Sequence, residues 1–259
     1  MELSLYQIDS FANKPFEGNP AAICPLDAWL PDEVMQSIAN ENNLSETAFF
    51  VKNSTGFDIR WFTPAKEVDL CGHATLASAF VLFNILGYSE QTICFDSKSG
   101  ILEVTRNDNM FEMDFPSQVA TPCPIPEQIL NAFEEQPVEC LKAEDYIVVF
   151  ENESSIFNAK PDLSLLAELD LRGVAITSKA TKYDFIIRFF APNYGINEDP
   201  VTGSAFTQLI PYWSKVLNKS ELTAKQESNR GGEVGCLYAG DRVKISGKAA
   251  KYMIGTIEI

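Results

Sequence analysis

A carboxylate stands at the start of one of the most apolar segments of this 259-residue chain. Residues 43–51 read NLSETAFFV, and the run after Glu46 has the β-branched and aromatic bias of a buried strand. One interpretation of Glu46 is a capping box, since Asn43 and Glu46 have the spacing at which each side chain bonds the other's backbone N–H. That would need a helix, but polar residues break the run at 52–56, which favours a strand. Glu46 is therefore a candidate acid or base.

A second carboxylate lies in the densest polar segment, INEDPVTGSAF at 196–206. Asp199 precedes a proline, which pushes its backbone toward an extended conformation before the chain turns into Gly203. The structural alternative is an ordinary turn followed by a helix N-cap, with Thr202 or Ser204 satisfying the first helical N–H groups. Asp199 is the second candidate for acid/base chemistry.

His73, in EVDLCGHAT at 67–75, is the only histidine of the chain. One histidine excludes a histidine-rich metal site, and no G-x-S-x-G segment supports a serine triad. The chain also lacks the glycine-rich motifs that cradle nucleotide phosphates. What remains is acid/base chemistry by carboxylates, this histidine and the cysteines, against the alternative that His73 is a locally bonded side chain at a helix start.

Charge and composition limit the classes of binding partner and the cellular compartment. The formal net charge is -16, which argues against nucleic acid and anionic membranes because both select basic patches. No run approaches the roughly 18 apolar residues of a membrane span, and the first twenty residues do not resemble a signal peptide. The six cysteines are scattered without a C-x-x-C pair, so neither a zinc knuckle nor a disulfide scaffold is indicated. These features predict a reduced, soluble, cytoplasmic protein.

Strand and helix patterns are interspersed along the chain, which predicts a protein built from both kinds of element. A segment with three prolines at 119–128 is the expected linker, giving domains 1–118 and 119–259. Strands are expected at 3–12, 46–51, 57–63, three places within 92–116, 146–151, 173–178, 185–192, 234–238, 242–245 and 253–259. Helices are expected at 31–43, 73–86, 161–170 and 203–217.

The two halves also echo one another. Each contains F-x-P followed by a glycine that opens an apolar helix: Phe62 and Gly72 in the first half, Phe190 and Gly203 in the second. The spacing is ten residues in the first case and thirteen in the second, so the echo is imperfect. If the halves are related, two helix N-termini facing one cleft would favour a small anion, because free N–H groups and the helix dipole attract negative charge.

The chain resembles the PhzF-like (phenazine-biosynthesis) family, whose relatives include diaminopimelate epimerase and proline racemase. Five blocks carry the resemblance, and together they extend across nearly the whole chain. They are FEGNPAAIC (16–24), NLSETAFFV (43–51), WFTPAKEVDLCGHAT (61–75), RFFAPNYGINEDPVTGSA (188–205) and ESNRGGEV (227–234).

The resemblance implies an α+β, diaminopimelate epimerase-like fold of two similar lobes. Each lobe is a curled, barrel-like mixed sheet around a central helix, and a terminal strand can cross between lobes. It implies an active site in the cleft between the lobes, no cofactor or metal, and a homodimer. By the same matching, Glu46 is the family's acid/base residue. The residues expected to line the substrate site with it are Gly72, His73, Asp199, Gly203 and Ser204.

One departure from the wider superfamily bears on the reaction. Racemases and epimerases of this fold resemble one another in placing a cysteine before each helix-opening glycine, but here Cys71 precedes Gly72 whereas Thr202 precedes Gly203. A single carboxylate that removes a proton and returns it to another carbon would shift a double bond. We therefore expect an isomerase acting on a small molecule with a carboxylate. The alternatives are a non-catalytic small-anion binding protein, or a lyase or hydrolase on the same scaffold.

Overall fold

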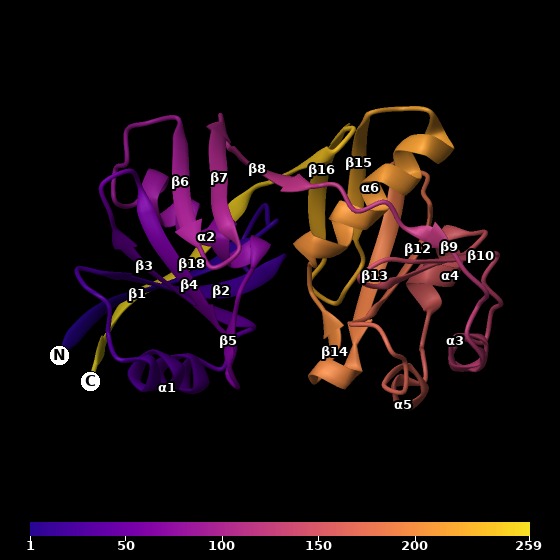
Figure 1. Cartoon of the computed structure of the whole chain (residues 1–259), viewed down its shortest axis with the longest axis horizontal. Helices are drawn as coiled ribbons and strands as arrows, with labels where there is room; N and C mark the ends of the chain where they lie inside the picture. The colour runs from indigo at the N-terminus through magenta and orange to yellow at the C-terminus, as the bar shows by residue number, and fades with distance from the viewer. The chain divides into compact units, whose positions relative to one another are not determined.

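The computed structural model describes residues 1–259 and divides them into two compact units. The first comprises Met1–Asp114 together with Ser246–Ile259, and the second comprises Phe115–Ile245. The C-terminal segment thus belongs with the N-terminal part of the chain, and its yellow strand lies beside the indigo first strand in Figure 1. Not one of the helices combines the length and apolarity that a membrane crossing requires.

The first unit is a mixed sheet with two helices, α1 (Asp32–Asn42) and α2 (Gly72–Asn84). Its strands run in the order β18–β1–β2–β3–β4–β6–β7–β8, with β5 paired to the end of β4. The pairs β2–β3 and β4–β6 are parallel and the others are antiparallel. The strands are β1 (Glu2–Ser10), β2 (Asn19–Leu26), β3 (Glu46–Lys52), β4 (Phe57–Phe62), β5 (Glu67–Val68), β6 (Thr92–Ser97), β7 (Gly100–Asn107), β8 (Met110–Pro116) and β18 (Ala249–Glu258).

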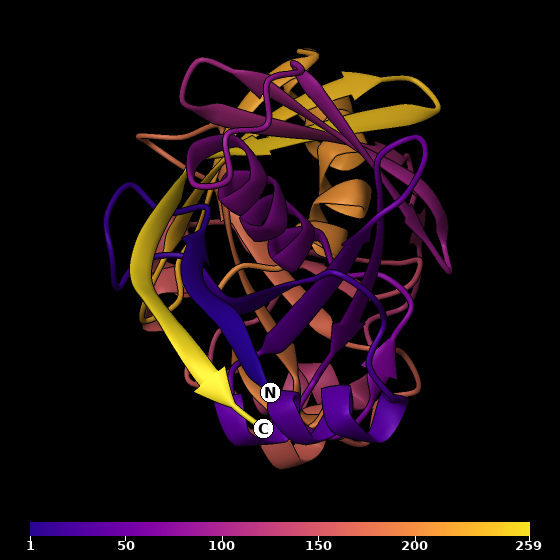
Figure 2. The ribbon, with the colours of Figure 1, turned by 90° about the vertical axis from the view of Figure 1, so that its left-hand side faces the viewer.

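Helix α2 forms the core of this unit. It contacts β18, β1, β2 and β3 on one side and β7 on the other, so the sheet curls around it, as Figure 2 shows. This position explains the sequence of α2, which is apolar almost all round and buried from His73 to Ala79. Helix α1 is amphipathic and covers the outer face, where Met35 and Ile38 pack against Phe49 and Phe62.

The second unit repeats this plan around α6 (Gly203–Leu217), which packs against two of its strands. The strands are β9 (Thr121–Pro122), β10 (Glu139–Lys142), β11 (Tyr146–Val149), β12 (Val174–Lys179), β13 (Phe185–Ala191), β14 (Ile196–Asp199), β15 (Glu221–Gln226), β16 (Gly232–Ala239) and β17 (Arg242–Gly247). Short helices α3 (Glu127–Ala132), α4 (Glu153–Asn158) and α5 (Leu163–Leu166) cover a second apolar cluster.

The strand pairings show that the two units are related by an internal repeat. In the first unit β2–β3 is parallel, β3–β4 antiparallel, β4–β6 parallel and β6–β7 antiparallel. The pairs β11–β12, β12–β13, β13–β15 and β15–β16 follow the same sequence of directions. The predicted fold of two similar lobes is therefore confirmed. The unequal F-x-P spacing arises because a 3₁₀ turn at Pro192–Tyr194 and a longer β14 occupy the second half.

The repeat assigns a counterpart to Glu46. The phenylalanine of each F-x-P segment serves as the reference point: Phe62 pairs with Thr47, and Phe190 pairs with Val174. Thr47 and Val174 are therefore equivalent, and the residues directly before them, Glu46 and Gly173, are equivalent as well. A Cβ atom on Gly173 would lie 2.5 Å from Phe189 Cζ and 2.8 Å from the Phe190 carbonyl oxygen. The packing of the second unit thus leaves no room for a side chain there.

The structure confirms the strand that follows Glu46 and excludes the alternative of a capping box, and two local predictions are wrong. Asn43 ends α1 in a left-handed conformation, with φ of 48°, and Glu46 begins a strand, so there is no capping box. The helix expected at 161–170 is only Leu163–Leu166, because the chain continues in tighter turns in which Leu169 N–H bonds the Leu166 carbonyl. The expected linker at 119–128 contains β9 and leads directly into α3.

We expect Gly173→Ala to lower the free energy of unfolding by about 2 kcal/mol, because the added methyl group overpacks a closed site. For a domain pair of this size that corresponds to a fall in Tm of roughly 4–8 °C in a calorimetric scan. Gly255→Ala is the matched control, since nothing lies within 4 Å of its added Cβ. Equal stability of the two variants would contradict the close packing at Gly173.

Candidate active site

The backbone at Glu46 is held from both sides. Glu46 is the first residue of β3 and pairs with Ala21 of the parallel strand β2. Just before it, the Ser45 hydroxyl donates to Asn19 Oδ1 at 3.1 Å, and just after it Thr47 Oγ1 accepts from Asn42 Nδ2 at 3.0 Å. Asn19 and Thr47 are fully buried. The carboxylate is therefore carried on a rigid strand end.

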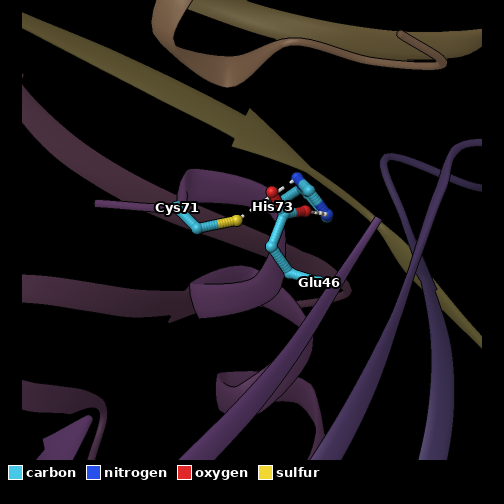
Figure 3. A group of neighbouring side chains, drawn as sticks. All are labelled: Glu46, Cys71 and His73. Atoms are coloured by element: carbon cyan, nitrogen blue, oxygen red, sulfur yellow. Dashed lines mark hydrogen bonds and ion pairs between the residues drawn. The ribbon is translucent and has the colours of Figure 1, made fainter. Parts of the chain in front are cut away.

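His73 faces Glu46 from the first turn of α2. Its backbone carbonyl accepts a hydrogen bond of 2.6 Å from the buried hydroxyl of Ser10, which ties the start of the helix to β1. The imidazole Nε2 lies 3.0 Å from Glu46 Oε2 (Figure 3), and the two side chains are 8% and 14% exposed. The structure thus brings together two of the predicted site residues, with Gly72 beside them.

The contact between these side chains is close but not directed as a hydrogen bond. Glu46 Oε2 and His73 Nε2 are both buried, and each has the other, in an ion pair of 3.0 Å, as its only partner. A buried polar atom left without a partner costs about 1–3 kcal/mol, so native structures rarely keep one without a function. With no other partner on either atom, this pair has room in its hydrogen bonding for a ligand group or a transferred proton.

Cys71 completes the group in Figure 3, with Sγ 3.5 Å from His73 Nδ1. Burial raises the pKa of the Cys71 thiol and the Glu46 charge adds to this, so the thiol stays protonated near neutral pH. For His73, burial favours the neutral imidazole, but the neighbouring Cys71 and Glu46 outweigh it and raise the pKa well above its usual value. Because the thiol is neutral, we attribute the imidazolium mainly to the Glu46 carboxylate.

The same three residues could hold a metal ion. One donor atom from each of Glu46, Cys71 and His73 lies within 4.8 Å of the other two. Nitrogen, thiolate and carboxylate donors are a set that Zn²⁺ accepts, and catalytic zinc sites use three protein ligands. A metal would occupy the carboxylate oxygen that a proton transfer needs, so the two uses of Glu46 compete. A metal-free site stays a prediction.

Asp199 ends β14 in the second unit and is fixed through Thr202 and Gln226. The Thr202 hydroxyl donates to Asp199 Oδ2 at 2.5 Å. Gln226, fully buried at the end of β15, accepts the Thr202 N–H at 2.8 Å and donates to the Asp199 carbonyl oxygen at 2.8 Å. Gln226 therefore holds the turn between Asp199 and α6 in one conformation.

The N-termini of α2 and α6 keep their first N–H groups available. No side chain caps either helix, which contradicts the interpretation of Thr202 or Ser204 as the cap of α6. The N–H groups of Gly72 and His73, and those of Gly203 and Ser204, make no hydrogen bond within the protein. Each pair of N–H groups lies at the positive end of a long buried helix and can stabilise a negative charge.

The predicted site residues thus form one group in each unit: Glu46, Gly72 and His73 in the first, and Asp199, Gly203 and Ser204 in the second. Sequence reasoning missed Gln226 and Ser10, whose roles depend on strand pairing and helix placement. No local motif marks either of them. For Cys71, the signal was its place directly before the G-H-A segment.

Comparison with known proteins places the whole chain in one family. The family model for the phenazine biosynthesis-like protein matches residues 8–255. An uncharacterized isomerase of Pseudomonas aeruginosa is 51% identical over the full length of both chains, and one of Halalkalibacterium halodurans is 44% identical over 96% of both.

Solved structures agree with this assignment. The crystal structure of a phenazine biosynthesis protein of the PhzF family from Enterococcus faecalis matches all of both chains with a TM-score of 0.98 at 45% identity. A hydroxyproline epimerase from Agrobacterium vitis, at 8% identity and a TM-score of 0.60, covers 99% of this chain and 92% of its own and shows the fold alone. The protein belongs to the phenazine biosynthesis-like family and is, like its curated bacterial relatives, an isomerase of epimerase-like fold.

Proposed function

We propose that the isomerase is cofactor-independent and uses Glu46 as its single general acid/base. Glu46 takes a proton from one carbon of a small carboxylate-bearing substrate and returns it to another. The observation that carries the proposal is the buried Glu46 Oε2, without a hydrogen-bond partner and 3.0 Å from His73 Nε2. A base needs an acceptor atom that is held in place and not fully occupied by hydrogen bonds, and an oxygen whose only partner is one imidazole supports that role.

The protein offers one acid/base residue rather than two that face each other across the substrate. This favours the shift of a double bond over the inversion of a stereocentre. The repeat places Gly173 where a second carboxylate would stand, and its closed packing excludes any side chain. A cysteine precedes the helix-opening glycine in the first unit only, since Thr202 takes that position in the second. One group must therefore both remove and return the proton.

The reaction has two proton transfers. Glu46 first breaks a C–H bond next to a double bond of the substrate and becomes protonated, and the released electron pair is delocalised over that double bond and the substrate carboxylate. The far carbon of the original double bond then takes the proton from Glu46 as the double bond shifts by one position, so atoms and charge balance at the end of the cycle. The His73 imidazolium, 3.0 Å from Glu46 Oε2, is proposed to stabilise the negative charge during the transfer.

Breaking a C–H bond has a high activation barrier, and a general base alone lowers it too little. General acid/base catalysis supplies roughly 10²–10⁴-fold, about 3–5 kcal/mol. Free N–H groups at Gly72 and His73, and at Gly203 and Ser204, are proposed to bind the substrate carboxylate and the negative charge that develops on it. A single donor of this kind is worth about 2.7–4 kcal/mol in other enzymes. Asp199, oriented by Thr202, is proposed to donate a proton or orient the substrate.

We expect Glu46→Gln to abolish proton exchange while ligand binding persists, because the amide keeps the shape but cannot accept the proton. The substrate is first sought by incubating a panel of small cyclic, unsaturated and amino acids with the protein in D₂O and reading deuterium uptake by mass spectrometry. Glu46→Gln should lower the uptake rate at least about 10³-fold. Glu41→Gln, an exposed carboxylate of α1, is the matched control.

Exchange that survives in Glu46→Gln would overturn the assignment of the base. Product analysis separates the remaining alternatives: an unchanged product mass supports an isomerase, and loss of a fragment indicates a lyase. Addition of water indicates a hydrolase. Binding without exchange in the wild type indicates a non-catalytic anion-binding protein.

The single histidine allows a direct test of the Cys71–His73–Glu46 group. In protein labelled with ¹⁵N-histidine, the two ring nitrogen signals should remain those of the imidazolium above pH 7, because the pKa of His73 is raised. Glu46→Gln and Cys71→Ala should each move the titration midpoint to lower pH, and Glu46→Gln should move it further. Cys94→Ser, outside this group, should not change it. A wild-type imidazole that is neutral at pH 7 would contradict the ion pair.

Asp199→Asn should reduce kcat by about 10–100-fold with a smaller change in KM, since the amide can still accept the Thr202 hydroxyl but carries no charge and no acidic proton. Asp241→Asn, an exposed aspartate of the same unit, is the control. Unchanged kcat in Asp199→Asn, measured on the substrate found by the exchange screen, would leave Asp199 with a structural role only.

A further inference from the structure

We propose that Cys123 and Cys140 are a site of reversible oxidation, at which peroxide converts two neighbouring thiols into a disulfide. Their sulfur atoms lie 3.7 Å apart in the second unit. All six cysteines are free thiols in the structure, and the proton-transfer site uses neither of these two. The proposal is therefore independent of the proposed reaction.

The backbone places the two residues opposite each other. Strands β9 and β10 are antiparallel, with Thr121 facing Lys142 and Pro122 facing Leu141. Cys123 and Cys140 continue this register, and the Cys123 N–H bonds the Cys140 carbonyl at 2.9 Å. Opposite residues of such a pair have Cα atoms about 4.5–5.5 Å apart, inside the range of about 4.4–6.8 Å found for disulfides. Rotation of the two side chains at the strand end can thus bring the sulfur atoms from 3.7 Å to bonding distance without a large backbone movement.

The two thiols differ in a way that assigns their roles. Cys123 is partly exposed, whereas Cys140 is 2% exposed and belongs to the apolar cluster under α3. Burial raises the pKa of Cys140 to about 12, with Cys123 adding to the effect. Peroxide therefore meets Cys123 first, and Cys140 is the resolving thiol.

The chemistry balances in two steps. The Cys123 thiol gives up its proton and its sulfur attacks one peroxide oxygen. The O–O bond breaks, the leaving hydroxide takes up that proton, and Cys123 becomes a sulfenic acid with release of one water. The Cys140 sulfur then attacks the Cys123 sulfur, the S–O bond breaks, and a second water leaves with the Cys140 proton. Two thiols are oxidised and one peroxide is reduced, so no further reagent is required. A thiol reductant reverses the change.

The cross-link would close a loop that includes α3, whose Ile129 and Ala132 pack into the same cluster as Cys140. Closing a loop of this size restricts the unfolded chain more than the folded one. Oxidation should thus strengthen the second unit without touching Glu46 or His73, and Cys71 is protected by burial.

The test uses the full chain treated with hydrogen peroxide, alkylated and digested without reduction. Trypsin leaves both cysteines in one peptide, because no Lys or Arg lies between them, so a glutamate-specific protease is used. Cleavage at Glu112, Glu127, Glu139 and Glu144 should give peptides 113–127 and 140–144 joined as one species, lighter by two hydrogens than their sum and separated by a thiol reductant.

Calorimetry of the same samples gives a second readout. Oxidised wild type should have a Tm higher by about 5 °C or more, and reduction should reverse the shift. Cys123→Ser and Cys140→Ser should each lose the linked peptide and the shift, and the partly exposed Cys123 makes the first variant the safer one to fold. Cys94→Ser, also partly exposed, should keep both. Sulfinic acid at Cys123 without a link, or a link to another cysteine, would overturn the proposal.

Discussion

The first unit has to hold the side chains of Glu46 and His73 in a fixed contact of 3.0 Å. Two buried polar atoms without hydrogen-bond partners are unfavourable, and the packing around them must hold them against relaxation into better geometry. A strand end supplies one and the first turn of a buried helix supplies the other. The bond from the Ser10 hydroxyl to the His73 carbonyl and the bond from Ser45 to Asn19 keep these two elements from shifting.

The curled sheet supports this contact because it encloses α2, the helix that carries His73. A helix that is apolar on all sides needs strands on all sides, and α2 obtains them because β18, β1, β2 and β3 cover it on one side and β7 on the other. Its N-terminus then emerges at the ends of β1, β2 and β3, where Ser10, Asn19 and Glu46 lie. The return of the C-terminal strand to β1 completes the enclosure. The site is rigid because the core that supports it is closed.

Features that depend on local sequence pattern could be predicted from the sequence alone. The strand character of the run after Glu46, the burial of the helix after Gly72 and the echo between the halves depend on local pattern, and the structure confirms them. Register does not depend on local pattern, so neither the correspondence between Glu46 and Gly173 in the repeat nor the role of Gln226 could be inferred. The helix expected at 161–170 failed because the apolar side chains Leu169 and Leu171 pack into the tertiary core from tight turns, where helical periodicity alone suggested a helix.

The second unit holds a buried carboxylate in a different way. Beside Gly173, Arg172 donates to the fully buried Asp145 through Nε at 2.9 Å and through Nη2 at 2.5 Å, and Gln208 of α6 donates to the same carboxylate at 2.6 Å. The Asp145 N–H in turn donates to Gln208 Oε1 at 3.0 Å. Every polar atom of this buried carboxylate is paired, which fixes it as a structural charge. At Glu46, by contrast, the buried Oε2 atom has only the His73 imidazole beside it, and the corresponding position of the second unit, Gly173, carries no side chain. That difference between two halves of one plan is the physical argument behind the proposal that Glu46 is the base.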